Sequence, residues 1–234
     1  WESLSSDERR LFARMMEVYA GFMTHTDAQI GRLVDFIEKL GELDDTLLIL
    51  MSDNGASAEG GLKGSFNEAF FFNMVPESLE ENLRRIDDLG TPRAHNHYPW
   101  GWAWAGNTPL KRFKRDTHEG GVCDPLIVHW PAKLGRPGQT RHQYVHVVDI
   151  APTILDLLGV DPPARLAGVA QTPMHGTSFA HTFADAGAAS RHVTQYYEMI
   201  GSRASYHDGW KAVAYHPARA AVYDGTDVSK PFED

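Results

Sequence analysis

Residues 47–61 have the sequence LLILMSDNGASAEGG, in which an apolar run is followed at once by small and polar residues. The apolar half predicts a strand covered on both faces, because such strands show near-continuous apolar runs. The strand is expected to reach the surface at Asp53 and Asn54. Two kinds of structure favour an acid beside its amide at such a place: a plain turn, and a site for a hard cation.

Asp53 and Asn54 can approach one ion only if the backbone turns out of the strand, because neighbours in a strand point to opposite faces. Gly55 permits such a turn. Ligands of open α/β sheets usually bind at the carboxyl ends of the strands, and one charged and one neutral oxygen suit calcium or magnesium. The local pattern alone favours the turn, which selects the same residues.

An amphipathic helix precedes this strand. Apolar residues recur at three- and four-residue steps through residues 5–40, with Ser5 or Ser6 as the expected N-cap. A second buried strand is predicted at residues 125–131, and a short helix ends before Gly159. Helices that alternate with wholly apolar strands predict an α/β fold, in which a mostly parallel central sheet is flanked by helices.

Residues 62–108 interrupt this alternation with a long segment rich in aromatic and histidine residues. Long segments of this kind in an enzyme are usually lids or pocket walls, so we expect a pocket-wall insertion here. Trp100, Trp102 and Trp104 alternate within it, which fits a half-buried strand as well as a substrate platform.

The last part of the chain differs in character from the first. An Asp-Gly pair at 208–209 separates two strand-like runs and predicts a β-hairpin. Residues 193–234 are therefore expected to form an incomplete antiparallel subdomain, and residues 1–192 to belong to the α/β domain.

Composition excludes some classes of protein. The net charge of −9 over 234 residues argues against nucleic-acid binding, and a single cysteine excludes an internal disulfide framework. The sequence has no window of eighteen uninterrupted apolar residues, so no membrane span is expected. The chain opens at Trp1 rather than Met, so we expect both ends to be cut from a longer protein. That leaves the cytoplasm and the periplasm both open as compartments, and the sequence gives no oligomeric state.

A basic block with the sequence NTPLKRFKRDTHEGGVCDPLIVHWP occupies residues 107–131. A lysine beside a metal ion can hold an anionic ester and steady its leaving oxygen. Charged loop residues are mostly just solvated, so the block alone favours a solvated basic loop. Cys123 is expected to be a small buried hydrophobe.

The histidine pair His95 and His97 has the short spacing of a metal-binding pair. Two ligands leave a zinc site half built, so we expect a pocket-wall or structural role instead.

Several motifs in one order resemble the sulfatase family of the alkaline-phosphatase-like superfamily. They are HTDAQIGRLVDFIEKLGELDDTLLILMSDNGA at 25–56, the block at 107–131, and HVVDIAPTILDLLG at 146–159. The inserted segment and a late YHDGWKAV hairpin at 206–213 resemble the bacterial arylsulfatase type most.

The resemblance implies roles for particular residues. Asp53 and Asn54 would bind a divalent cation, commonly Ca²⁺, although Mg²⁺ stays open. Lys114, five residues before Glu119, would contact the sulfate and the bridging oxygen of a small-molecule sulfate ester. The substrate pocket is expected to include His97, Trp102 and His118.

The family's nucleophile is missing from this sequence. Sulfatases use a formylglycine made from a Cys/Ser-x-Pro-x-Arg motif, and Cys123-Asp124-Pro125 matches only its first three positions, with Ile127 in place of Arg. The resemblance therefore implies the C-terminal part of a sulfatase, inactive by itself, with its formylglycine in an N-terminal part outside this chain. A phosphonate monoester or phosphodiester hydrolase of the same superfamily, or an inactive anion-binding relative, are the alternatives.

Overall fold

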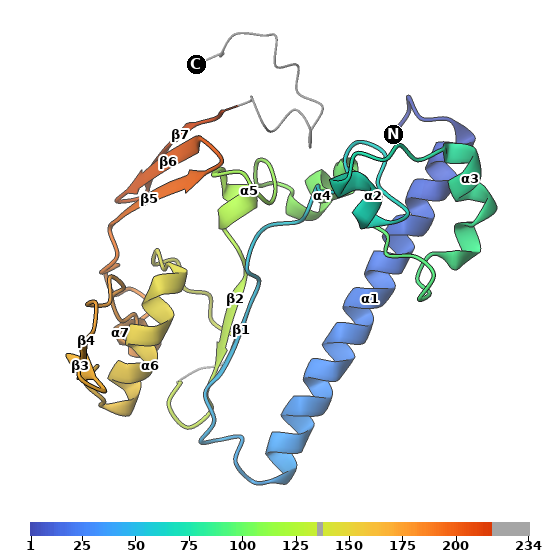
Figure 1. Ribbon diagram of the computed structural model, residues 1–234. Helices are drawn as coiled ribbons and strands as arrows, with labels where there is room; N and C mark the ends of the chain where they lie inside the picture. Colours follow the sequence, from blue (N-terminus) through green and yellow to red (C-terminus); the bar gives the residue numbers. More distant parts are fainter. Residues whose placement is uncertain (135–137, 217–234) are drawn as a thin grey trace.

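The helix α1 extends over Ser6–Lys39 in the computed structural model, which describes residues 1–134 and 138–216 (Figure 1). A capping box fixes its start: Glu8 donates its backbone N–H to Ser5 Oγ at 3.2 Å, and Ser5 donates its own to Glu8 Oε2 at 2.9 Å. The expected N-cap at Ser5 is thus confirmed. Only the first half of α1 is anchored in the core, through Leu11 and Met15.

Strands β1 (Leu48–Met51) and β2 (Leu126–His129) form a two-stranded ladder in the middle of the molecule. They pair antiparallel, with Leu48 opposite His129 and Met51 opposite Leu126. The expected parallel pairing therefore does not occur among the described strands. The reason is the connection: residues 52–125 leave β1 at Met51 and return at the same end of the ladder, whereas parallel strands need a crossover to the other end.

The connecting segments contain short helices. They are α2 (Glu68–Phe72), α3 (Leu79–Arg84), η1 (Ile86–Asp88), α4 (Trp100–Asn107), α5 (Glu119–Val122), η2 (Val147–Asp149), α6 (Ile150–Leu158) and α7 (His181–Ala184). Gly159 ends α6 in the left-handed conformation, with a φ of 63°, as the sequence predicts. A small ladder of β3 (Arg165–Leu166) and β4 (Val169–Ala170) lies between α6 and α7.

The tryptophan-rich segment is helical, so the interpretation of a half-buried strand was wrong. Trp100 and Trp104 lie four residues apart and therefore share one face of α4. Their rings lie 6.3 Å apart, and each packs against Phe113, at 6.4 and 5.9 Å between ring centroids. Tertiary packing of aromatic rings therefore outweighs the alternation seen in the sequence.

The C-terminal antiparallel sheet is confirmed. It consists of β5 (Thr194–Met199), β6 (Ser202–His207) and β7 (Trp210–Ala214) in that order. The predicted hairpin turns at Asp208 and Gly209, whose φ values of 46° and 87° are those of a tight two-residue turn. The rest of the expected subdomain, residues 217–234, lies outside the described residues.

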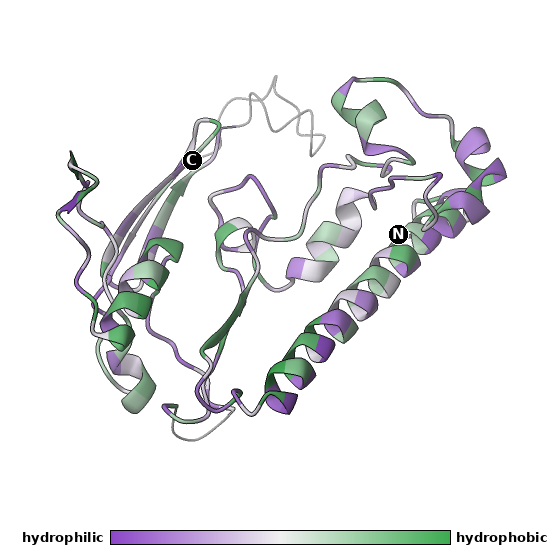
Figure 2. Ribbon diagram, turned by 60° about the horizontal axis from the view of Figure 1, so that its bottom comes forward, coloured by the Kyte–Doolittle hydropathy of each residue, from purple (hydrophilic) through white to green (hydrophobic). Residues whose placement is uncertain are grey.

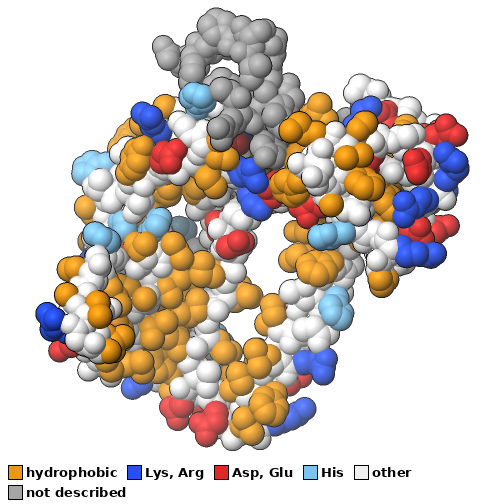
Figure 3. Space-filling model, in the orientation of Figure 1, with side chains coloured by type: hydrophobic (Ala, Val, Ile, Leu, Met, Phe, Trp, Pro, Cys, Tyr) orange, Lys and Arg blue, Asp and Glu red, His pale blue; other side chains and the backbone are white. Residues whose placement is uncertain are grey.

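Many apolar side chains stay exposed. Phe22, Leu33 and Phe36 of α1 are 56–63% exposed, and Leu50 of β1 and Ile127 of β2 are 46% and 58% exposed. Figure 2 shows the apolar colouring of β1, β2 and α6, and Figure 3 shows hydrophobic side chains gathered over α6 and an opening beside α1. In the described part of the chain, no helix is both long and apolar enough to cross a membrane.

Candidate functional site

Two loops meet at the end of the ladder where β1 stops and β2 begins. The loop after β1 donates Ser52 N–H to Pro125 O at 3.3 Å, and the loop before β2 donates Lys114 N–H to Ala56 O at 3.0 Å. The predicted metal residues follow β1, and the predicted catalytic lysine precedes β2. The structure therefore brings these two groups of site residues into adjacent loops.

Glycines make this close approach possible. A Cβ on Gly55 would lie 1.7 Å from Gly120 O, and a Cβ on Gly120 would lie 2.0 Å from Arg112 O. A Cβ on Gly121 would likewise clash, because it would lie 2.1 Å from Asp116 O. The pair Gly120-Gly121 thus lets the backbone pass close to another backbone.

Asn107, the last residue of α4, bridges the two loops. Its Nδ2 donates to Arg112 O at 2.9 Å and to Gly120 O at 2.7 Å, and its Oδ1 accepts from Ala56 N–H at 3.1 Å. One side-chain amide therefore fixes the spacing between the loop that follows β1, at Asp53 to Ala56, and the loop that precedes β2, at Lys111 to Gly121 (the lysine loop). The sequence analysis missed Asn107, because nothing local separates it from an ordinary helix end.

The expected metal residues lie at the surface end of the site. Asp53 is exposed, and Asn54 donates its Nδ2 to Gly55 O at 3.0 Å. This hydrogen bond uses the donor end of the Asn54 amide, and a hard cation binds the other end, Oδ1. Ser52 Oγ donates to Asn54 O at 2.8 Å and holds the turn.

A second carboxylate, Asp124, lies close enough to Asp53 to be perturbed by it. Desolvation first, and then the charge of Asp53, raise the pKa of Asp124 from 3.8 to about 6. A place where two carboxylates and an amide oxygen meet suits a divalent cation, which would relieve the repulsion. Within residues 1–134 and 138–216, no group of three or more His, Cys, Asp or Glu side chains is arranged to hold a metal. The oxygen atoms of Asp53 and Asn54 are of the type that hard cations bind, and they would supply only part of a ligand set.

We expect Asp124→Asn to raise the melting temperature at pH 8 and to have little effect near pH 3.5. The folded pKa of about 6 lies above the ordinary value of 3.8, so ionisation of Asp124 costs stability that is absent below about pH 4 and develops as the pH rises to about 6. The gain at pH 8 should be about 1 kcal/mol, after allowance for solvent screening. Thermal unfolding in metal-free buffer measures it, and equal shifts at both pH values would contradict this account.

Lys114 lies in an ion-pair network around the buried carboxylate of Glu59. Lys114 Nζ donates to Glu59 Oε2 at 2.6 Å, and an Arg115 guanidinium nitrogen lies 2.5 Å from Oε1. Burial by itself would raise the pKa of Glu59, but the hydrogen bond from Lys114 and the charges of Arg115 and Lys114 outweigh it and hold the pKa below its ordinary value. By contrast, Lys111 is exposed.

His97 reaches the same network, whereas Trp102 does not. His97 Nε2 lies 2.9 Å from Ser57 Oγ, and Ser57 Oγ donates to Glu59 Oε2 at 3.1 Å. Trp102 packs against the start of the chain: its Nε1 donates to Phe12 O at 3.0 Å, and its ring lies 5.6 Å from that of Trp1.

The third expected pocket residue, His118, lies beside the C-terminal sheet. Its ring centroid is 6.0 Å from that of Tyr215, and the Arg112 guanidinium carbon stands 4.0 Å from the same Tyr215 ring. Lys211 of β7 pairs with Glu119 at 2.5 Å. The sheet therefore contacts the lysine loop directly, a role for Lys211 and Tyr215 that the sequence analysis missed.

Cys123 is exposed, so the expectation of a buried hydrophobe was wrong. It lies in the short link between α5 and β2, which leaves the residue at the surface. Partial desolvation first, and then the neighbouring carboxylate of Glu119, raise the pKa of its thiol. A raised pKa keeps the thiol protonated, which agrees with its rejection as the nucleophile.

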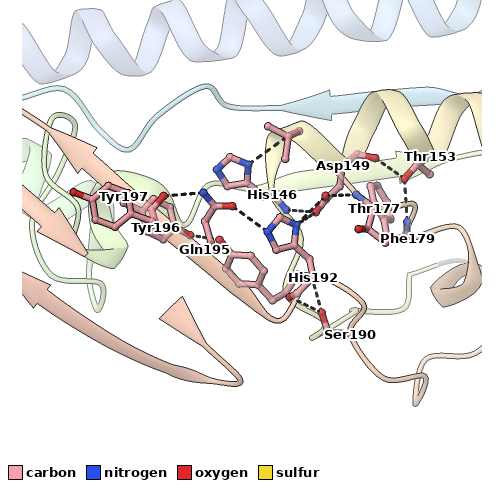
Figure 4. Close-up of polar contacts among 12 residues, drawn as sticks. His146, Asp149, Thr153, Thr177, Phe179, Ser190, His192, Gln195, Tyr196 and Tyr197 are labelled. Atoms are coloured by element: carbon pink, nitrogen blue, oxygen red, sulfur yellow. Dashed lines mark hydrogen bonds and ion pairs between the residues drawn. The ribbon is translucent and has the colours of Figure 1, made fainter. Parts of the chain in front are cut away.

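A separate polar cluster joins α6 to the C-terminal sheet (Figure 4). Asp149, 1% exposed, faces His192 Nδ1 with both carboxylate oxygens, at 2.9 and 2.8 Å. It also accepts backbone N–H groups from His146 and Thr177, each at 2.8 Å. On its other side, His192 Nε2 lies 3.0 Å from Gln195 Oε1 at the start of β5. The cluster is fully bonded and pins the sheet to α6.

We expect Asp149→Ala to lower the free energy of unfolding by about 3–5 kcal/mol, because it leaves His192 and two backbone donors buried without their acceptor. The matched control is Asp156→Ala in α6, the helix that follows Asp149, where the exposed carboxylate accepts from Ser178 Oγ at 2.5 Å. Its cost should stay below about 1 kcal/mol. Urea unfolding of both variants provides the comparison, and equal costs would refute the pinning role.

Comparisons with known proteins show to which family the chain belongs. The model of the family described as Sulfatase matches residues 2–160, and that described as N-sulphoglucosamine sulphohydrolase, C-terminal, matches residues 111–216. Because the first match covers more than half of the chain, the chain belongs to the sulfatase family.

Curated relatives include an uncharacterised sulfatase of Schizosaccharomyces pombe, 34% identical over 70% of this chain and 28% of the relative. An arylsulfatase of Klebsiella aerogenes is 30% identical over 76% of this chain and 37% of its own length. An N-acetylglucosamine-6-O-sulfatase of Bacteroides thetaiotaomicron is 25% identical, over 70% and 20%. The chain thus spans between a fifth and two fifths of the length of these relatives.

A solved structure, reported with glycosaminoglycan metabolism by Bacteroides thetaiotaomicron, has a TM-score of 0.52 and 20% identity. The match covers 83% of this chain and 32% of that one. It shows the fold alone, which is the α/β, alkaline-phosphatase-like fold of sulfatases.

Proposed function

We propose that this chain is the C-terminal part of a sulfatase that hydrolyses small sulfate esters of the aryl sulfate type. The observation that carries this proposal is the packing of the Asp53-Asn54 loop on the Lys114 loop, backbone against backbone, at one end of β1 and β2. Cation ligands and an anion-binding lysine at one place are what a sulfate ester needs.

Each residue of the site has a distinct task in this proposal. Asp53 and Asn54 hold a Ca²⁺ ion, which polarises the sulfate oxygens when it is bound. Lys114 stabilises the negative charge that develops on the bridging oxygen as the S–O bond breaks. The formylglycine that supplies the nucleophile belongs to a part of the protein outside this chain.

The exposed apolar faces support a larger folded unit. Apolar side chains on the second half of α1 and on both strands stay exposed in the described part of the chain. Exposed apolar patches normally pack against other parts of a protein. The 234-residue chain alone is expected to show no sulfatase turnover, because it has no Cys/Ser-x-Pro-x-Arg motif for the formylglycine.

The substrate class can be tested on the complete protein. We expect kcat/KM for 4-nitrophenyl sulfate to exceed that for bis(4-nitrophenyl) phosphate. A markedly higher value for the phosphodiester would replace the proposal by a phosphodiester hydrolase of the same superfamily. No turnover of either ester, together with no Cys/Ser-x-Pro-x-Arg motif in the remaining sequence, would indicate a relative that only binds anions.

A further inference from the structure

We propose that Glu59 is a positioning residue that orients Lys114 toward the sulfate group. The proposal rests on the function proposed above, because it needs Lys114 to contact the ester. Nothing in the sequence motifs marks Glu59, which is separated from Lys114 by 55 positions. The geometry assigns the role, since the two side chains meet at 2.6 Å.

The buried Glu59 carboxylate forms ion pairs with two cationic side chains, Lys114 and Arg115. Its side chain is 8% exposed, while those of Lys114 and Arg115 are 33% and 28% exposed. The carboxylate is therefore inside the protein, and both cations extend outward from it. Arg115 has a φ of 76°, which breaks the usual alternation of side chains and lets two consecutive residues reach one carboxylate. A non-glycine residue with positive φ is the kind of strain that the surrounding contacts must maintain.

Binding to Glu59 leaves Lys114 competent for an anion. An ammonium group has three donors, and Glu59 takes one of them, so the others remain for a sulfate oxygen and the bridging oxygen. Two cations around one carboxylate leave one positive charge in excess within this group of three side chains. The long, flexible lysine side chain is thereby held in one place before the substrate arrives, which is the requirement for efficient stabilisation of a developing charge.

Glu59 is itself held in place by Ser57, which His97 contacts in turn. Ser57 Oγ donates to Oε2 at 3.1 Å and accepts the Glu59 backbone N–H at 3.3 Å. His97 Nε2 contacts the same hydroxyl at 2.9 Å, and His97 Nδ1 lies 2.9 Å from Tyr98 O. His97 thus belongs to the support of the lysine. The chain of contacts runs from His97 through Ser57 and Glu59 to Lys114.

A double-mutant cycle in the complete protein tests this role. Glu59→Gln keeps the shape and removes the charge, and we expect kcat/KM for 4-nitrophenyl sulfate to fall about tenfold to hundredfold, as for a catalytic group displaced by about 1 Å. In a Lys114→Ala background, the same substitution should change kcat/KM by less than about twofold, because its effect acts through Lys114.

The matched control is Glu77→Gln. Glu77 is also partly buried and accepts backbone N–H groups, from Phe66 at 2.6 Å and Asn67 at 3.2 Å, but it contacts no residue of the lysine loop. Its effect should be the same with and without Lys114. If Glu59→Gln does not fold, Ser57→Ala takes its place, with a several-fold loss that vanishes in the Lys114→Ala background.

Two failures are distinguishable. Suppose that Lys114→Ala lowers kcat/KM and that Glu59→Gln lowers it by the same factor in the Lys114→Ala background as in the unmutated protein. Glu59 then does not act through the lysine, and only this inference is overturned. If Lys114→Ala costs nothing, the proposed function itself fails, and the positioning role fails with it. A Glu59→Asp variant that regains part of the Glu59→Gln loss, again only when Lys114 is present, supports the inference.

Discussion

We expect Lys114→Ala to lower kcat/KM of the complete protein for an aryl sulfate by about 10²–10³-fold, the usual effect of removing one group that stabilises developing charge. Lys114 lies in the loop that packs against the Asp53-Asn54 loop, and its Nζ is anchored to buried Glu59 at 2.6 Å. The side chain therefore adopts a defined position beside the expected cation, where its charge is worth more than in bulk water.

The matched control is Lys111→Ala in the same loop. Lys111 is exposed, and its contact with the glycine pair is made by the backbone: the Lys111 carbonyl accepts Gly120 N–H at 2.8 Å. Truncation of the side chain leaves that hydrogen bond intact, so we expect less than about threefold loss for a solvated surface charge. Steady-state kinetics on both variants make the comparison. Similar losses would mean that the wrong lysine was assigned.

We expect Asp53→Ala to abolish calcium retention and sulfatase turnover in the complete protein. A hard-cation site depends on its carboxylates, and Asp53 supplies the charged ligand of the Asp-Asn pair. The loss should be larger than that of Asn54→Ala, which removes a neutral oxygen. Metal analysis of the purified variants after dialysis against trace calcium measures the content directly.

Asp45→Ala serves as the control for Asp53→Ala. Asp45 is exposed and lies before β1, at the other end of the strand from Asp53. It has the same charge and a similar exposure, so its replacement should leave the calcium content unchanged. Stoichiometric calcium retained by Asp53→Ala would refute the ligand role.

Local patterns in the sequence predict the elements of the fold, but not how they pair. The capped helix, both apolar strands and the Asp-Gly hairpin follow from propensities within a few residues. The antiparallel pairing of β1 and β2 depends on the path of residues 52–125, and no local signal in the sequence encodes that path. The helical tryptophan segment was missed for a related reason, since its rings pack against Phe113.

The candidate site, like the fold, could be predicted from the sequence only in part. The resemblance selects Lys114 by its distance from Glu119, and the structure places that lysine loop against the Asp-Asn loop. Asn107 and Asp124 were not predicted, because each acts on a partner far away in the sequence. A contact of this kind is determined by the close approach of two loops, which only the fold reveals.

Anomalous diffraction from crystals of the complete protein with calcium and sulfate tests the central claim most directly, namely that the two loops form one metal and sulfate site. We expect a calcium peak about 2.3–2.6 Å from carboxylate and amide oxygens of Asp53 and Asn54. A sulfate should lie within about 3 Å of Lys114 Nζ. A calcium ion bound elsewhere, with both loops free of sulfate, would contradict the account.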